Sequence, residues 1–369
     1  DFGLVVRSGV FVDIAKVKPL FENALHCVLK SEMENDGFNR LIIAAGLNSH
    51  QIFLLRGYCK YLLQIGIPYS QSYLENTLER HPDITRSIVK LFELKFDPKL
   101  QKDSTKKINR QFKLISKALN SVPSLDEDRI FRKYLNLVGA TLRTNYFQKD
   151  EEGSPKLYLS FKIDSRNFSD VPVPRPHVEI FVHSTQVDAV HLRGGKVSRG
   201  GIRWSDRKED FRTEILGLMK SQMTKNAIIV PVGAKGGFFV KKQLISKEGH
   251  ESLEEAISCY KIFMRGLLDI TDNLKGNRVL PLKDVIRYDD DDPYLVVAAD
   301  KGTANFSDIA NGVSEEYGFW LGDAFASGGS EGYDHKKMGI TARGSWEAVK
   351  RHFRELGIDV MAMPFTCVG

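Results

Sequence analysis

A single lysine among small residues is the first feature of the sequence that could do chemistry. Lys235 lies in "PVGAKGGF", residues 231–238, which follows the apolar run of residues 227–230. Such a run is typical of a buried strand, so the glycines come where that strand is expected to end. One interpretation is a glycine turn that carries Lys235 as a solvated side chain. The other is that the glycines admit a ligand, which Lys235 contacts.

The ligand interpretation has two versions. A phosphate loop needs Ser or Thr directly after its lysine, but Lys235 is followed by Gly236, Gly237 and Phe238. The second version is a desolvated lysine that gives up its proton and acts as a base. Lys225 lies ten residues earlier, across the expected strand, and would face the same pocket. Two cations in one dry pocket favour the loss of a proton from one of them.

A carboxylate that could exchange protons with this base follows another apolar run. Asp300 comes directly after residues 295–299 and before Gly302. At the end of a strand beside a lysine, it would pass protons to a leaving amine. The alternative is that Asp300 caps a helix beginning near Phe306, although Asn305 is better placed for that role.

The segment "RGGKVSRGGIRWSDR" combines several basic residues with glycines and one tryptophan. A solvated loop is one interpretation. A nucleic-acid site is another, but it would have more aromatic residues and more total charge. A small-carboxylate site fits better, because glycines expose backbone amides and arginine binds carboxylates with two hydrogen bonds. The basic residues are Arg193, Lys196, Arg199, Arg203 and Arg207.

Composition limits the class of protein. A chain of 369 residues with 42% hydrophobic content is long enough for two or three domains. No run approaches the roughly 18 apolar residues of a membrane span. Four scattered cysteines without a C-x-x-C pair argue against a zinc site and indicate a reducing cytoplasm. The net charge of +6 is small for a dedicated nucleic-acid binder. The acidic run 289–292 lacks the spacing of a calcium loop, so we expect a solvated loop and no metal site.

The elements that must position these residues change type once along the chain. Helical patterns continue to about residue 145, and Ser124 begins a capping box for one of these helices. Strands are expected at 156–163, 177–183 and 188–192, and helices resume near Asp210 and Glu251, which predicts an α/β fold. The apolar faces expected in the first part are Ile84, Ile88 and Leu91; Ile108, Phe112, Ile115 and Leu119; and Ile130, Tyr134 and Leu137.

Five motifs in a fixed order resemble those of glutamate dehydrogenases. They are R-G-G-I-R, M-T-K-N-A, P-V-G-A-K-G-G, A-A-D-K-G-T and G-I-T-A-R-G. They lie within residues 190–369 and look closest to the large NAD-specific class, in which a long N-terminal region precedes the catalytic core. The resemblance implies oxidative deamination of L-glutamate to 2-oxoglutarate and ammonia, with NAD as cofactor, in a cytoplasmic homo-oligomer that binds neither nucleic acid nor membrane.

The resemblance also implies a role for each matched residue. Lys235 would be the catalytic lysine and Asp300 the catalytic aspartate. Lys225 would bind the α-carboxylate of glutamate, and Arg199 stands where small members of the family have a lysine for the side-chain carboxylate. The remaining expected site residues are Gly201 and Arg203 for the substrate, and Thr341, near the nicotinamide amide, and Arg343 for the cofactor.

The resemblance implies a fold in three parts. Residues 1–147 would form a mainly α-helical region, 156–340 an α/β catalytic domain with a mixed sheet and flanking helices, and 341–369 the start of a truncated Rossmann-like NAD-binding domain. Its first strand is expected at "DVMAMPFTCVG", residues 359–369, and the glycine-rich residues 326–339 would form an active-site loop. We therefore expect a piece of a longer enzyme, inactive by itself.

Two other functions are compatible with the sequence. A basic nucleic-acid-binding module would predict affinity that depends steeply on salt. A non-catalytic regulatory role for residues 1–145 is also compatible, because apolar helical stripes carry no information about partners.

Overall fold

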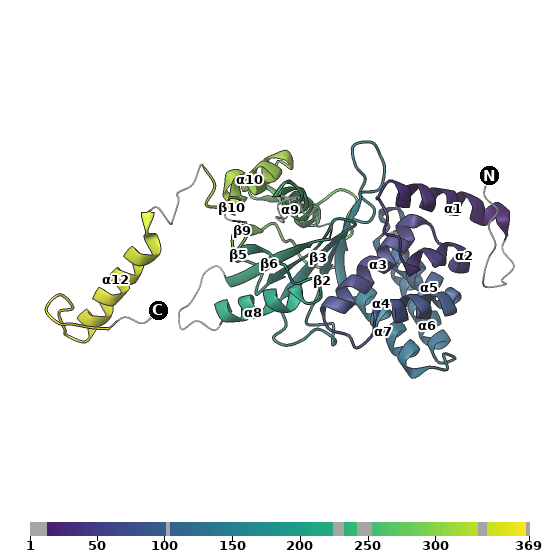
Figure 1. Cartoon of the computed structure of the whole chain (residues 1–369), viewed down its shortest axis with the longest axis horizontal. Coiled ribbons are helices and arrows are strands. Elements are labelled where there is room, and N and C mark those ends of the chain that lie inside the picture. Colours follow the sequence, from purple (N-terminus) through teal and green to yellow (C-terminus); the bar gives the residue numbers. More distant parts are fainter. Residues whose placement is uncertain are drawn as a thin grey trace, which may run out of the picture.

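The structure is a computed structural model of the chain. Helices dominate its first 140 residues, and a mixed sheet with flanking helices follows, which confirms the expected α/β class with a helical N-terminal region (Figure 1). The described residues are 13–100, 104–223, 232–241, 253–303, 305–330 and 338–366.

The helical region begins its elements where the sequence provides caps. Asn48 and Gln51 form a reciprocal capping box at the start of the third helix, and the Ser124 side chain accepts the Glu127 amide at the start of the seventh, as expected. The helices are α1 (Ile14–Leu29), α2 (Leu41–Ala45), α3 (Ser49–Gln64), α4 (Gln71–Arg80), α5 (Pro82–Phe96), α6 (Ser104–Leu119) and α7 (Leu125–Ala140), with short 3-10 turns η1 (Gly37–Arg40) and η2 (Pro98–Leu100).

The apolar stripes expected on α5 and α7 are buried, but the stripe on α6 is rotated. Ile115 and Leu119 are 1% exposed, whereas Phe112 is 40% exposed and Gln111 is buried in its place. Residues 111, 115 and 119 recur every four positions, so they share the buried face, and Phe112 lies about 100° away around the helix.

Eight strands form one mixed sheet in the order β1-β2-β3-β4-β6-β5-β9-β10. Neighbouring strands are antiparallel from β1 through β4 to β6, and they are parallel from β6 through β5 and β9 to β10. Strand β6 therefore joins the antiparallel half of the sheet to the parallel half. The strands are β1 (Thr141–Thr144), β2 (Tyr158–Ile163), β3 (Val178–Ser184), β4 (Val187–Arg193), β5 (Ser198–Trp204), β6 (Val232–Val240), β9 (Val296–Ala299) and β10 (Ala326–Ser327), with a separate hairpin β7 (Asn273–Lys275) and β8 (Arg278–Leu280).

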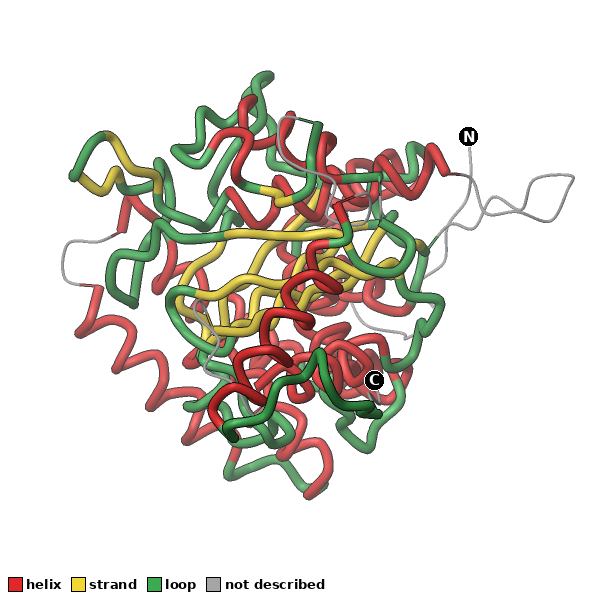
Figure 2. The backbone as a smooth tube through the Cα atoms, turned by 90° about the vertical axis from the view of Figure 1, so that its left-hand side faces the viewer, coloured by secondary structure: helices red, strands yellow, loops and turns green. Residues whose placement is uncertain are grey.

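Helices cover both faces of the sheet (Figure 2). Helix α8 (Phe211–Met223) packs on one face, together with the helical region, and Phe181 and Val190 point into this first core. Helix α9 (Leu253–Leu268) covers the other face together with α10 (Ser307–Glu316), where Ile180 and Val182 enter a second core. The remaining elements are η3 (Gly322–Ala324) and α12 (Ile340–Glu355).

The first core runs continuously from the helical region into the sheet. Tyr58 of α3 and Phe161 of β2 belong to it, and their rings lie 4.7 Å apart. Strand β1, at residues 141–144, already pairs with β2. The expected domain boundary at residue 147 therefore stays a prediction. Within the described residues, no helix combines the length and apolarity needed to cross a membrane.

The structure excludes one alternative about local structure, and one expectation was wrong. The glycine-rich residues 232–240 form strand β6, which excludes the glycine turn that was one of the two interpretations of this segment. The expected strand at 359–369 is absent over 359–366, the part that the structure describes. In these residues the ring of Phe365 packs onto the rings of Trp346 and Phe353 of α12. A strand needs a neighbouring strand to pair its backbone N–H and C=O groups, and the described part of this segment has none. The truncated Rossmann-like domain remains a prediction.

Candidate active site

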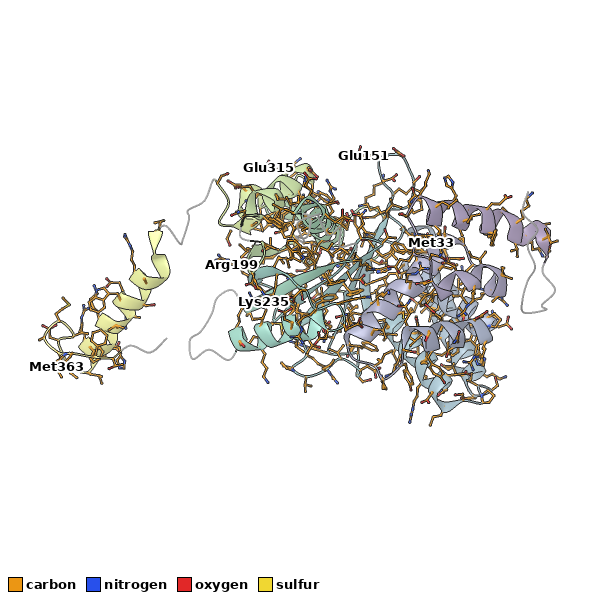
Figure 3. The ribbon with its side chains drawn as sticks, viewed as in Figure 1. Met33, Glu151, Arg199, Lys235, Glu315 and Met363 are labelled. Carbon is orange, nitrogen blue, oxygen red and sulfur yellow. The ribbon has the colours of Figure 1, made fainter. Side chains whose placement is uncertain are left out.

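Lys235 and Asp300 form an ion pair on the parallel half of the sheet. The Nζ atom of Lys235 in β6 lies 2.8 Å from Oδ2 of Asp300, the first residue after β9. Their side chains are 13% and 18% exposed. The pair is thus largely enclosed but still accessible, as a proton-transferring pair must be. Figure 3 shows Lys235 near Arg199 at one end of the sheet.

The register of the parallel strands brings these two residues together. Ile202 of β5 lies opposite Gly236 of β6 and also opposite Ala299 of β9. Lys235 and Asp300, one position from each partner of Ile202, consequently lie beside β5 from its two sides. Lys235 and Asp300 are 65 positions apart in the sequence, so periodicity cannot pair them, whereas strand register does so directly.

The glycines of β5 make this approach possible. A Cβ on Gly200 would lie 1.4 Å from the carbonyl oxygen of Ala234, which no relaxation could accommodate. A Cβ on Gly201 would lie 2.8 Å from the carbonyl oxygen of Ala299 and 3.2 Å from Nζ of Lys235. Gly201 therefore lets strand β5 lie directly against the ion pair, with no side chain in between. The structure places this expected site residue beside Lys235, and its role in substrate binding stays a prediction.

The glycines of "PVGAKGGF" likewise provide room and do not form a turn. A Cβ on Gly236 would lie 2.5 Å from Cδ1 of Ile202, and one on Gly237 would lie 2.4 Å from Cδ1 of Ile215. Neither glycine has a positive φ angle. Their function is to let β5 and α8 pack closely on both faces of β6, which fixes the backbone that carries Lys235.

Arg203 is held between two carboxylates. Its Nη1 lies 2.9 Å from Oε1 of Glu214, in the first turn of α8, and its Nε lies 3.5 Å from Oδ2 of Asp300. Ser205 Oγ donates to the other oxygen of Glu214 at 2.7 Å. In this structure Arg203 positions Asp300, and its expected role as a substrate ligand stays a prediction. Sequence reasoning missed Glu214 and Ser205.

The environment of Asp300 favours its carboxylate form. Burial raises the pKa of Asp300, but the hydrogen bond from Lys235, the Lys301 amide and the charges of Lys235 and Arg203 outweigh it, so the net pKa is lowered. The backbone is fixed as well, since the Asp300 amide donates to Oγ1 of Thr303 at 3.0 Å, and that hydroxyl donates to the Ile202 carbonyl at 2.6 Å. Asp300 does not cap the next helix, whose N-cap is Phe306.

Arg199 lies on the same face of β5 as Gly201 and Arg203. Alternate residues of a strand share a face, and two residues span about 6.6 Å. Arg199 is exposed, and its Nη2 donates to Oγ of Ser327 in β10 at 2.9 Å. The structure therefore aligns an accessible guanidinium with the space over Gly201, as a carboxylate-binding residue requires. Ser327 belongs to the glycine-rich segment expected to line the site.

Three expected site residues are not brought to the pair by the described structure. Lys225 lies outside the described residues, as do residues 331–337 of the expected active-site loop. Thr341 belongs to α12, but its side chain is outside the described part. Arg343, in the first turns of α12, is exposed, and Figure 1 shows this helix away from the sheet.

The other basic residues of the segment 193–207 have structural partners. Lys196 pairs with Asp290 at 2.8 Å, and Arg207 pairs with Asp210. The segment is thus no uncompensated basic patch. The run 289–292 is likewise not simply a solvated loop, because two of its carboxylates belong to a buried charge cluster formed by Arg143, Lys162, Arg193, Asp289 and Asp292. Among the described residues, no three His, Cys, Asp or Glu are arranged to hold a metal ion.

Comparison with known families matches most of the chain. Residues 114–369 match the model described as "Bacterial NAD-glutamate dehydrogenase, catalytic domain". Residues 33–98 match the model described as "Glutamate dehydrogenase, helical motif 3". The first match includes Lys235, Asp300, Arg199 and Arg203.

Individual relatives agree with these matches. The chain is 54% identical to the NAD-specific glutamate dehydrogenase of Halomonas elongata over all 369 of its residues, and 52% identical over its whole length to that of Pseudomonas aeruginosa. It spans 23% of the length of each of these relatives. A hetero-hexameric glutamate dehydrogenase from Thermus thermophilus matches 56% of this chain and 42% of its own at 16% identity and a TM-score of 0.31, which is too low to support an argument.

Proposed function

This chain belongs to the family of bacterial NAD-glutamate dehydrogenases, and we propose that it supplies the substrate-binding and proton-transfer groups for NAD-dependent oxidation of L-glutamate to 2-oxoglutarate and ammonia. The observation that carries the proposal is the ion pair of Lys235 and Asp300, which stays accessible to solvent and lies directly against Gly201, near the exposed guanidinium of Arg199. An acid and a base in hydrogen-bond contact that a ligand can reach form the minimal equipment for hydrolysing an imine.

Binding would place the substrate over the pair. The guanidinium of Arg199 binds one carboxylate of glutamate with two hydrogen bonds, which replace the contact of Arg199 with Ser327. Lys225, which precedes β6 in sequence, binds the other carboxylate. Two fixed carboxylates determine which way Cα faces, and this orientation lowers the entropic part of the barrier. NAD, when bound, accepts the hydride from that carbon.

Side chains of the site then transfer protons during hydrolysis of the imine. Asp300, held as a carboxylate by its surroundings, accepts the proton of Lys235 across the 2.8 Å contact. The lysine amine then takes a proton from the water that attacks the substrate imine, and Asp300 delivers its proton to the departing amine. The products are 2-oxoglutarate and ammonium. Arg203 and Glu214 keep Asp300 in place during this exchange.

The residues of α12 fit a nucleotide cofactor. Arg343 is exposed and has no ion-pair partner within the described part of the chain, so its guanidinium is available for the anionic diphosphate of NAD. Thr341 would contact the nicotinamide amide. These two assignments and the expected homo-oligomeric, cytoplasmic enzyme remain predictions, and sedimentation of the complete enzyme would test the oligomer.

Substitution of Lys235 tests the proposal. In the complete enzyme, Lys235→Ala should lower turnover by about a hundredfold or more and leave NAD affinity nearly unchanged, because the loss falls on proton transfer. Lys275→Ala, on the exposed hairpin β7, is the matched control. Steady-state kinetics and a separate NAD titration measure the two effects. Wild-type turnover in Lys235→Ala would refute the proposal.

Substitution of Arg199 tests substrate binding independently. Arg199→Ala should weaken glutamate binding by about 1.5 to 3 kcal/mol, the range for a hydrogen bond to a charged group, and leave NAD affinity unchanged. Lys225→Ala should do the same. Both are measured through KM for glutamate at saturating NAD. Unchanged KM in both variants would show that the carboxylates are bound elsewhere.

A further inference from the structure

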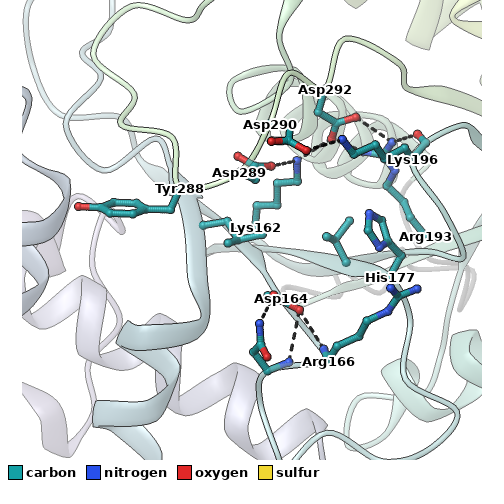
Figure 4. Close-up of a pocket in the computed structure, with 13 residues that line it drawn as sticks. Lys162, Asp164, Arg166, His177, Arg193, Lys196, Tyr288, Asp289, Asp290 and Asp292 are labelled. Atoms are coloured by element: carbon teal, nitrogen blue, oxygen red, sulfur yellow. Dashed lines mark hydrogen bonds and ion pairs between the residues drawn. The ribbon is translucent and has the colours of Figure 1, made fainter.

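A polar cavity lies at the far end of the antiparallel strands, away from Lys235. It has a volume of about 380 Å³ and is lined by the ends of β2, β3 and β4 and by the loops at 164–167 and 288–292 (Figure 4). This volume lies within the range of small-molecule sites. The charged and ring-bearing lining residues are Lys162, Asp164, Arg166, His177, Arg193, Lys196, Tyr288, Asp289, Asp290 and Asp292.

The carboxylates of the lining already have donors within the protein. Asp292 accepts from Arg193 at 2.5 and 3.0 Å and from Lys162 at 2.6 Å. Asp289 is paired with Arg143 and Lys162, and Asp290 with Lys196.

Asp164 accepts two backbone amides and the side-chain amide of Asn167. The acidic side of the cavity is therefore saturated and has little capacity left to attract a cation.

The donors on the opposite wall are not saturated. The backbone amide of Arg166 bonds to Asp164, but its guanidinium has no partner among the described residues, and neither has the ring of His177. Figure 4 shows the Arg166 side chain directed toward His177. Arg166 is exposed and His177 is half-buried, so their N–H groups, which have no acceptor among the described residues, remain available to solvent or to a ligand.

The charges around His177 give this wall a positive field. The charges of Arg166, Arg193 and Lys162 act on the ring, and the charge of Asp292 acts in the opposite sense. Burial first, and then the three cations, lower the pKa of His177, which only Asp292 opposes. His177 is thus uncharged at neutral pH, and a bound anion would favour its protonation.

From these observations we infer that the cavity binds a small oxyanion, a carboxylate or phosphate group, between the guanidinium of Arg166 and the ring of His177. The planar fork of arginine matches two oxygens of either group. The inference does not depend on the proposed dehydrogenase activity.

Arg193 connects this cavity to the strands of the candidate active site. Its Nε lies 3.3 Å from Oγ of Ser198, the residue before Arg199, and its Nη2 donates to the carbonyl of Tyr294, just before β9. A ligand that shifts Arg193 would move the starts of both strands. Resting on the proposed function, this connection predicts that the oxyanion changes KM for glutamate by about fivefold or more in the complete enzyme.

Calorimetric titration of this chain with sodium sulfate and with succinate tests the binding site. Sulfate stands for tetrahedral oxyanions and succinate for carboxylates. We expect saturable binding of at least one, weakened about tenfold or more in Arg166→Gln. Arg278→Gln, on the exposed strand β8, is the matched control and should bind like the wild type. The tighter of the two anions identifies the chemistry of the ligand.

The pH dependence distinguishes this site from general attraction to a basic protein. Sulfate keeps its charge between about pH 6 and pH 8, so stronger binding at the lower pH reports protonation of His177. His177→Gln should remove that dependence. Absence of saturable binding by either anion, or equal weakening in Arg166→Gln and Arg278→Gln, would overturn the inference. If only the KM prediction failed, the anion site would be retained, but the proposed effect of the anion on the candidate active site would be refuted.

Discussion

Two sets of ion-paired side chains lie on the same sheet, and they differ in how completely their charges are paired. In the buried charge cluster, Asp292 is 7% exposed and holds two cations, while Arg143 is fully buried between two acids. At the candidate active site, Lys235 has one acidic partner, and both members of the pair are partly exposed. The charges of the cluster hold strands together, whereas the pair keeps bonding capacity that solvent can reach.

The difference teaches how to separate a structural charge from a functional one. Taking a charge out of water is costly, and a buried ion stays ionised only when its partners replace the lost solvation. Saturation therefore indicates that a group serves the fold. A charged pair that remains partly unsaturated beneath a glycine has kept its capacity for a ligand. Stability should accordingly depend on the cluster, and activity on the pair.

The largest effect on stability is expected from Asp292→Asn. The substitution leaves Arg193 and Lys162 buried with a neutral amide, and breaking a buried pair costs about 3 to 5 kcal/mol. Urea unfolding at neutral pH measures the loss. Asp291→Asn is the matched control, because Asp291 is 57% exposed and its one ion-pair partner among the described residues is Arg287, at 2.7 Å. Equal losses in the two variants would show that saturation does not mark the structural group.

An intermediate effect is expected from Gly201→Ala. The added methyl meets the Ala299 carbonyl at 2.8 Å and crowds Lys235 and Asp300, so overpacking should cost about 1 to 3 kcal/mol. Gly312→Ala in α10 is the control, since its Cβ would meet nothing within 4 Å. Thermal unfolding compares the two. In the complete enzyme, only Gly201→Ala should also lose turnover, because the methyl fills the space over the pair.

The sequence identified the two members of the ion pair but not the residues that hold them in place. Lys235 and Asp300 could be identified because each lies in a motif and follows an apolar run. Glu214 could not, since its contacts with Arg203 and Ser205 depend on how α8 packs against β5. No spacing pattern encodes that packing.

The two mistaken interpretations have a common physical origin. Asp289 and Asp292 were expected in a solvated loop because their cations, Lys162 and Arg193, lie about a hundred or more residues away. A turn was one of the two interpretations of Gly236 because glycine preferences are local, whereas its requirement comes from Ile202 on the neighbouring strand. The helical stripes were predicted well, since their periodicity is local.

The smallest effect on stability is expected from Asp300→Asn, although turnover should fall about as far as in Lys235→Ala. A partly exposed pair contributes only about 1 kcal/mol or less, because solvent screens it. The pKa of Asp300 is lowered in the folded state, so its contribution is present above the unfolded value of 3.8 and is lost as pH falls through the folded value. The stability difference between wild type and Asp300→Asn should therefore be small at pH 7 and vanish in acid, as urea unfolding across this pH range would show. A loss as large as that in Asp292→Asn would mean that Asp300 serves the fold as much as the reaction, and the contrast between the two charge groups would fail.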